Sequence, residues 1–266
     1  MSAAAVVVGV DGSSASRIAL EWAANRAGHG RLLLRLVHLY TVSGEEEEDR
    51  LLESREWLAA AGAYLRRDHP ELAWTSVSEP GDTAGLAARA MWNELLVIGT
   101  HKTGFVHGRV FGSLGLRLAA TAGATIAVVP ASTTAHSAGV VVGVDSSAVG
   151  DAAIRFAARE AQQSGQDLIL VRAHGPVPTR RAVDEAAEMT FAGARIAEDA
   201  APGVRVRTRA IDREPARALV EVAAMARMLV IGSSRRHRAG VPALGPVSFD
   251  VLVNLTSPTV VVHPAR

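Results

Sequence analysis

The sequence predicts an α/β fold made of two doubly wound domains, each with an open, parallel, five-stranded sheet. The 266-residue chain contains an internal repeat that divides it into two halves of similar length. Within each half, continuously apolar runs typical of buried parallel strands alternate with segments of helical periodicity. The chain is 48% hydrophobic, chiefly Ala, Val and Leu, and only 4% aromatic, which favours covered parallel strands over a β-sandwich.

Each half reads strand, helix, strand, helix, strand, helix, strand, loop, helix, strand. The run "AAVVVGV" is apolar throughout, whereas "SRIALEWAANRA" carries apolar residues at helical spacing. The acidic run "GEEEEDR" suits the positive end of the helix that follows it and predicts a solvated helix start. The predicted strands of the first half are Ala5–Val10, Leu32–Leu39, Ala73–Val77, Leu95–Gly99 and Thr125–Val129. Its predicted helices are Ala15–Ala27, Arg50–Arg67, Thr83–Trp92 and Ser113–Thr121. This alternation implies a parallel sheet with right-handed crossovers.

The two halves match along their whole length. The run "VVVGVDGSS" corresponds to "VVVGVDSSA", which places Asp11 134 residues before Asp145. The run "LLVIGTHK" corresponds to "MLVIGSSR", with Gly99 133 residues before Gly232. A nearly constant offset indicates a tandem duplication, and the polar stretch "PASTTAHSAG" between the copies is typical of a linker. We therefore predict domains at residues 1–131 and 138–266.

Composition excludes several classes of function. A net charge of +1 gives no overall field for recruiting nucleic acid. The chain has no Cys, which excludes a disulfide scaffold, a thiol nucleophile and a Cys-ligated zinc, and is compatible with a reducing compartment. The nine histidines show no HxxxH or HExxH spacing, so no metal site is expected. Neither a signal peptide nor a membrane-spanning run is visible, so we expect a cytoplasmic protein without membrane insertion.

Three stretches of the first half converge on one edge of the predicted sheet, beyond the carboxyl ends of the strands. Sheets of this kind bind ligands at that edge. Asp11 follows the first strand, Leu39 ends the second, and the stretch from Gly99 to Ser113 follows the fourth. Glycines there would let the backbone approach a phosphate, and a helix that starts at Ser113 offers unpaired N–H groups. The same glycines would also serve a tight strand-to-helix turn without any ligand.

Other familiar loop motifs are missing. No GxxxxGK[ST] is present, so the chain is not a P-loop protein. The first strand is followed by "GVDG" in place of GxGxxG, so the usual dinucleotide motif fails as well. There is no GxSxG either, and a hydrolase nucleophile elbow is not supported.

The first half resembles a universal stress protein domain, and the whole chain resembles a tandem member of that family. The nucleotide-binding branch of the family carries G-x2-G-x9-G-[ST] after the fourth strand and an Asp after the first. Gly99, Gly112 and Ser113 match this motif at the right spacing, Asp11 matches the acid, and Lys102 replaces the second Gly. The resemblance implies the fold of adenine nucleotide alpha-hydrolase-like proteins. It also implies an internal pseudo-dimer that pairs through the last strand of each half.

The resemblance further implies an ATP site, with any Mg²⁺ arriving on the phosphates. Asp11 would lie near the ribose and adenine, and Leu39 beside the base. The residues after the fourth strand would line the sugar and phosphates, and the helix start would hold the phosphates. The implied site consists of Asp11, Leu39, Ile98, Gly99, Thr100, Lys102, Gly112, Ser113, Leu114 and Gly115.

Both copies depart from the family pattern. The ammonium group of Lys102 would either contact the triphosphate or crowd the space that a glycine leaves open, or the side chain would simply be solvated. In the second copy, Arg235 occupies the second glycine position and Pro246 replaces the serine. Proline starts a helix well but offers neither an N–H nor a hydroxyl to a phosphate. We therefore predict a weaker second site, at Asp145, Gly232 and Gly245.

The expected function is that of an ATP-binding universal stress protein in a stress or regulatory response, with nucleotide mainly in the N-terminal half. An unidentified protein partner or a homodimer would complete the response. The first alternative is an interaction module of the same fold that binds no nucleotide. The second is a slow ATPase, although no general base or nucleophile is evident near the loop, so at most weak hydrolysis is expected.

Overall fold

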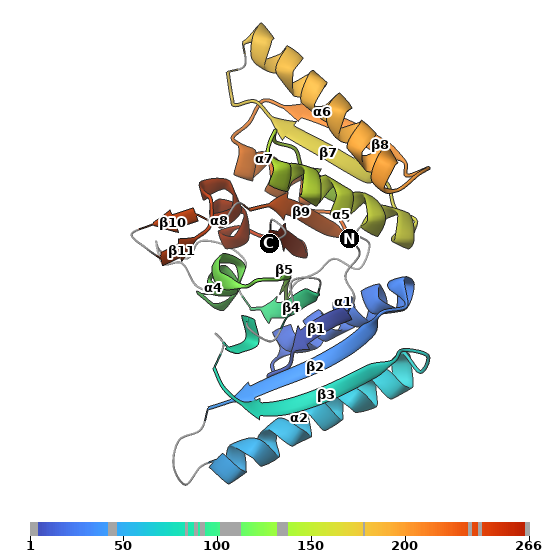
Figure 1. Cartoon of the computed structure of the whole chain (residues 1–266), viewed down its shortest axis with the longest axis vertical. Coiled ribbons are helices and arrows are strands. Elements are labelled where there is room, and N and C mark those ends of the chain that lie inside the picture. The colour runs from blue at the N-terminus through green and yellow to red at the C-terminus, as the bar shows by residue number, and fades with distance from the viewer. Residues whose placement is uncertain are drawn as a thin grey trace. The chain divides into compact units, whose positions relative to one another are not determined.

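A computed structural model describes most of the chain, in two compact units. Figure 1 shows their helices and strands in chain order. The first unit holds the described residues up to Ala131, and the second holds those from Ala138 onward. The described residues are 5–41, 47–82, 85–87, 90, 94–101, 113–131, 138–177, 179–233, 236–238 and 241–263.

The first unit is a five-stranded parallel sheet in the order β3-β2-β1-β4-β5. The chain moves outward from β1 to β3 and then returns to β4 on the other side of β1, so the strand order reverses between β1 and β4. This reversal is the topological switch point, where open α/β sheets bind their ligands. The elements are β1 (Ala5–Gly9), α1 (Ser14–Gly30), β2 (Leu33–Tyr40), α2 (Glu47–Asp68), β3 (Trp74–Pro80), β4 (Leu95–Thr100), α4 (Ser113–Thr121) and β5 (Thr125–Pro130).

Helices cover both faces of this sheet. Consecutive strand residues point to opposite faces. Gly99 of β4 lies against the backbone of Ala15 in α1, whereas the Ile98 side chain lies near Gly115 of α4. Helix α2 packs beside α1 on β2 and β3. The central strands are therefore enclosed, and Val6, Val7 and Val8 are fully buried.

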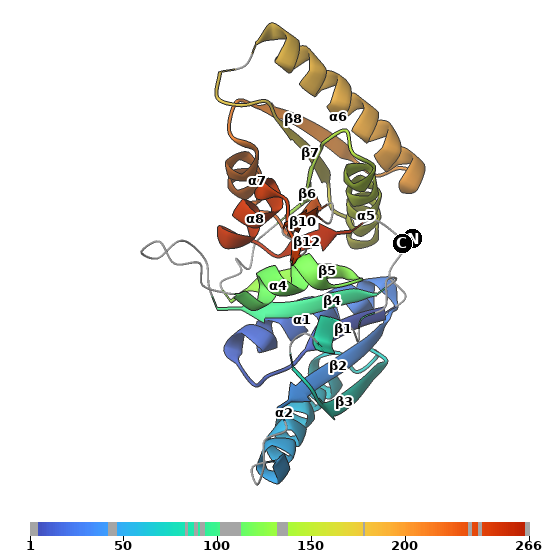
Figure 2. The same ribbon diagram turned by 60° about the vertical axis from the view of Figure 1, so that its left-hand side comes forward.

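The second unit repeats the design, with the strand order β12-β9-β6-β7-β8 and every pair parallel. In the views of Figures 1 and 2, α7 and α8 lie on one side of its strands and α5 on the other. The elements are β6 (Val140–Gly143), α5 (Ala148–Ser164), β7 (Leu168–Ala173), α6 (Arg180–Ala200), β8 (Val206–Ile211), α7 (Pro215–Ala223), β9 (Met228–Gly232), β10 (Arg236–Arg238), β11 (Val241–Ala243), α8 (Pro246–Val253) and β12 (Thr259–Val262).

These observations confirm the predicted fold class of two parallel α/β repeats, with some differences in detail. Helix α2 begins at Glu47, inside the acidic run, because carboxylates in a first turn face the positive end of the helix. Most of the predicted helix Thr83–Trp92 lies outside the described residues, although residues 85–87 are helical. The second copy has a short antiparallel hairpin, β10–β11, where we expected a loop. None of the helices in the described part of the chain combines the length and the apolar character needed to cross a bilayer.

One close approach fixes α1 on the sheet. A Cβ atom added to Gly99 would lie 2.2 Å from the carbonyl oxygen of Ala15, so no other residue fits there without moving backbone. The equivalent contact in the second unit is looser, because a Cβ at Gly232 would lie 3.0 Å from the carbonyl carbon and oxygen of Val149. The first turn of α1 thus lies directly against the end of β4, which brings two parts of the candidate site together.

Gly99→Ala is therefore expected to lower the free energy of unfolding of the first unit by about 1–3 kcal/mol or more, through overpacking against backbone. Gly232→Ala should cost less, because its neighbour needs to shift only slightly. Urea unfolding would be followed by circular dichroism and by tryptophan fluorescence, since all four tryptophans precede residue 131.

Gly28→Ala is the matched control, because an added Cβ there meets nothing within 4 Å and alanine favours a helix. It should leave stability unchanged or slightly raised. A Gly99→Ala protein as stable as the control would contradict the close-approach argument.

Candidate functional site

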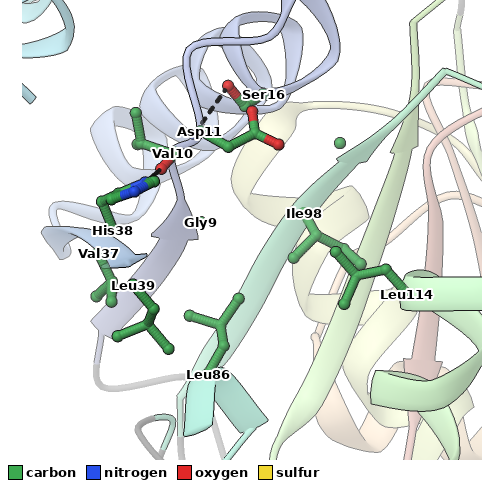
Figure 3. A pocket seen from close by; sticks show the side chains of 11 residues that line it. Gly9, Val10, Asp11, Ser16, Val37, His38, Leu39, Leu86, Ile98 and Leu114 are labelled. Carbon is green, nitrogen blue, oxygen red and sulfur yellow. Dashed lines mark hydrogen bonds between the residues drawn. The ribbon is translucent and has the colours of Figure 1, made fainter. Parts of the chain in front are cut away.

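A cavity of about 110 Å³ opens at the carboxyl ends of β1, β2 and β4, beside the start of α4. It lies at the switch point of the first sheet, where the sequence predicted a site. Figure 3 shows its walls, with the polar group of Asp11 on one side and apolar side chains around the hollow. The lining residues are Gly9, Val10, Asp11, Ser16, Val37, His38, Leu39, Leu86, Ile98, Gly99 and Leu114.

Asp11 lies in the turn between β1 and α1, and hydrogen bonds hold it there. Its Oδ1 accepts from the backbone N–H of Ser13 at 3.0 Å. Its own backbone N–H donates to Ser16 Oγ at 3.4 Å. Ser13 is also the N-cap of α1, where its hydroxyl accepts from the N–H of Ser16 at 3.1 Å. The carboxylate is thus fixed by the same serines that start the helix.

These contacts also keep Asp11 ionised. Partial burial raises the pKa of Asp11, but the hydrogen bonds from Ser13 and Ser16, together with the proximity of His38, outweigh it, so the pKa lies below its ordinary value of 3.8. A carboxylate can only accept hydrogen bonds, so the ligand group that suits it is a hydroxyl or an amine.

The rest of the cavity is apolar. Leu39, Leu86, Ile98 and Leu114 point toward the hollow from four different segments of the chain (Figure 3). Such a wall favours a flat or apolar ligand group, because burying apolar surface releases about 25 cal/mol per Å². Leu114 is the second residue of α4, so the wall adjoins the helix start with its unpaired N–H groups.

The structure brings some of the predicted site residues together and not others. Asp11, Leu39, Ile98, Gly99 and Leu114 line the one cavity. Ser113 begins α4 beside it, whereas Thr100 and Gly115 are not among its lining residues; a Cβ at Gly115 would instead meet Val128 of β5 at 3.3 Å. Lys102 and Gly112 lie outside the described residues.

The sequence prediction of the site did not include six of the lining residues: Gly9, Val10, Ser16, Val37, His38 and Leu86. Ser16 lies in the first turn of α1, five residues after Asp11, and this short separation from Asp11 was the only available signal. Leu86 follows β3, far along the chain from the other walls, and nothing in the local sequence marks it. His38 of β2 is 8% exposed and lines the cavity, and its Nδ1 donates to the Val10 carbonyl.

The second unit has a corresponding cavity of about 140 Å³ with altered chemistry. Oδ1 of Asp145 accepts from the N–H of Ser147 at 3.0 Å and from its hydroxyl at 2.6 Å. Arg172 replaces His38 and donates to the Val144 carbonyl at 3.2 Å. The lining residues are Gly143, Val144, Asp145, Val171, Arg172, Ala173, Pro215, Leu219, Ile231, Gly232, Val247 and Ser248.

The helix start differs most between the two copies. Helix α8 begins at Pro246, after an N-cap Gly245 that makes no side-chain capping bond. Ser248 Oγ donates back to the Gly232 carbonyl at 3.3 Å. Of the residues of the predicted weaker site, Asp145 and Gly232 line the second cavity, whereas Gly245 does not. In the described parts of both units, no three His, Asp or Glu side chains group as metal ligands.

Comparisons with known proteins show the family and the fold of the chain. The universal stress protein family profile matches residues 4–130 and 139–263. A universal stress protein of Mycobacterium tuberculosis is 27% identical over 301 residues, covering 96% of this chain and 94% of its own. A second one from the same organism is 29% identical over 285 residues, covering 96% of each chain. The crystal structure of a universal stress protein from Archaeoglobus fulgidus covers 99% of both chains at 14% identity, with a TM-score of 0.68.

Ser13→Ala should raise the pKa of Asp11 toward its ordinary value, because it removes the hydrogen bond from the Ser13 side chain that favours the carboxylate and keeps the one from the Ser13 backbone N–H. A depressed folded-state pKa gives stability that is complete above the ordinary value of 3.8 and is lost as pH falls through the folded value. The stability difference between wild type and Ser13→Ala should therefore shrink in acid. NMR titration of the Asp11 carboxyl carbon and urea unfolding at several pH values would measure both effects.

Loss of the helix cap itself costs about 0.5–2 kcal/mol at any pH. Thr179→Ala serves as the control, because Thr179 caps α6 through the Ala182 N–H at 3.2 Å. Its cost should not vary between pH 7 and pH 3. An Asp11 pKa that stays depressed in Ser13→Ala would show that Ser13 is not the cause.

Proposed function

This chain belongs to the universal stress protein family, and we propose that its N-terminal half binds ATP as the input of a stress or regulatory response. The observation that carries the proposal is the cavity at the switch point of the first sheet. A fixed carboxylate, an apolar wall and a helix start meet there within one unit. Each suits a different part of an adenine nucleotide.

The chemistry of each wall of the cavity indicates which part of the nucleotide would lie against it. Leu39 and the neighbouring apolar side chains suit the adenine ring, and the ionised Asp11 suits the ribose hydroxyls. The N–H groups at the start of α4, at Ser113, suit the phosphates. Lys102, Gly112 and Thr100 complete the site in our proposal, with Lys102 on the triphosphate. Any Mg²⁺ would be held mainly by the phosphates.

The second unit is proposed to bind nucleotide more weakly. Pro246 removes both an N–H and a hydroxyl from the helix start, and Ser248 directs its hydroxyl to the backbone of β9. Asp145 and Gly232 preserve part of the cavity wall. The physical output of binding in the first unit would be a change of conformation or of partner that ATP biases by binding one state better.

Two measurements test the proposal directly. Mass spectrometry of ligands released from freshly purified protein should detect an adenine nucleotide. Calorimetry with ATP on the whole chain should find one site that is clearly tighter than any other. Absence of a released nucleotide together with no heat of binding would favour an interaction module without nucleotide. Steady release of phosphate from ATP, lost in Asp11→Ala, would favour a slow ATPase.

Asp11→Ala should weaken ATP binding about tenfold or more, since hydrogen bonds to a charged group contribute about 1.5–3 kcal/mol. Calorimetry on the whole chain would measure the change. Asp145→Ala is the matched control from the second repeat and should leave the tighter site within about twofold of wild type. If Asp145→Ala removed the tighter site instead, the assignment of ATP to the first unit would be wrong.

A further inference from the structure

Trp57 of α2 lies against the turn that carries Asp11, although it does not line the cavity. Gly12, the next residue of that turn, has a left-handed backbone with φ of +74°. A Cβ added to Gly12 would lie 2.5 Å from the indole Nε1 of Trp57. The indole therefore packs directly on the turn and blocks its movement toward α2.

The same indole also contacts His38, which is hydrogen-bonded to the residue before Asp11. The rings of Trp57 and His38 meet edge to face, with centroids 4.9 Å apart and an angle of 77° between their planes. His38 donates from Nδ1 to the carbonyl of Val10, the residue before Asp11. Val10 and Gly12, which flank Asp11, are thus held through His38 and Trp57.

The second unit lacks this arrangement. The buried positions Ser54, Leu58 and Leu65 of α2 correspond to Ala186, Thr190 and Ala197 of α6, each 132 residues later. By that register Met189 takes the place of Trp57. Ser146 takes the place of Gly12 and does not have a positive φ. Arg172 keeps the bond to the strand-end carbonyl, but within the described part of the chain this aromatic contact occurs in the first unit alone.

We propose that Trp57 and His38 are positioning residues that hold the Asp11 turn in the conformation that binds the ligand. The inference rests on the proposed function for the identity of the ligand, ATP. The contacts of Trp57 and His38 with the turn do not depend on that function. Two aromatic side chains, one from β2 and one from α2, thus add to the hydrogen bonds that Ser13, Ser16 and the Val37 carbonyl make with this turn. Pre-organising a carboxylate in this way lowers the cost of ordering it when the ligand binds.

The test compares two tryptophans that each pack on a glycine: Trp57 of α2 on Gly12, and Trp74 of β3 on Gly62 of α2. Trp57→Ala removes the support of the turn. Trp74→Ala removes a comparable contact between β3 and α2, where a Cβ on Gly62 would lie 2.6 Å from Trp74. Both should lower the unfolding midpoint of the whole chain. Only Trp57→Ala should weaken ATP binding, by about tenfold, which corresponds to about 1.4 kcal/mol. Trp57→Phe, which keeps an aromatic ring on Gly12, should restore affinity to within about twofold.

A second readout needs no nucleotide. The pKa of Asp11, measured by NMR in the free protein, should rise toward its ordinary value in Trp57→Ala and stay depressed in Trp74→Ala and Trp57→Phe. This separates the two proposals: if wild-type protein bound no ATP, the proposed function would fail, while the pKa comparison would still test the positioning. Equal loss of affinity in Trp57→Ala and Trp74→Ala, or an unchanged Asp11 pKa in Trp57→Ala, would overturn the inference.

Discussion

The contact between Gly99 and Ala15 is the constraint on which the rest of the candidate site depends. Because Gly99 has no side chain, the first turn of α1 can lie directly on the end of β4. That turn carries Ser16, and Ser13 caps the helix just before it, so both hydrogen-bonding partners of Asp11 are placed by the same contact. Gly99, which the family motif associates with phosphates, is thus required for the packing of α1 on the end of β4. Folding therefore constrains this position independently of any ligand.

The two repeats separate what the fold needs from what the ligand would need. Both keep apolar central strands, an Asp after the first strand and a glycine at the end of the fourth. The second unit accepts a looser helix contact, a proline at the helix start and no aromatic support of the Asp turn. A duplicated domain can lose donors at a helix start without losing its sheet, because the sheet depends on strand burial and not on that loop. These three differences all lie at the carboxyl ends of the strands.

Periodicity and duplication predicted the strands, their parallel arrangement and the edge that holds the cavity, because these follow from local apolar patterns and chain topology. Asp11, Leu39 and Gly99 were found for the same reason, since each ends or follows a strand. Leu86 and Trp57 could not be found in this way. Leu86 reaches the cavity from a segment after β3, and Trp57 meets Gly12 across 45 residues of chain, so only the packing of helices on the sheet brings them near. Tertiary contacts of this kind leave no periodic signal.

The polarity of the site limits how a ligand can lie in it. An ionised carboxylate, kept charged by hydrogen bonds, stands at the end of β1 and would repel a phosphate placed there. The start of α4, at Ser113, presents N–H groups and the positive end of a helix, which favour an anion. Between them Leu39, Leu86 and Leu114 favour an apolar body. A ligand with hydroxyls, a flat ring and a distant anionic group satisfies all three conditions in one orientation. A free phosphate or a plain apolar molecule satisfies only one, so the asymmetry of charge across the cavity, more than its size, supports a nucleotide.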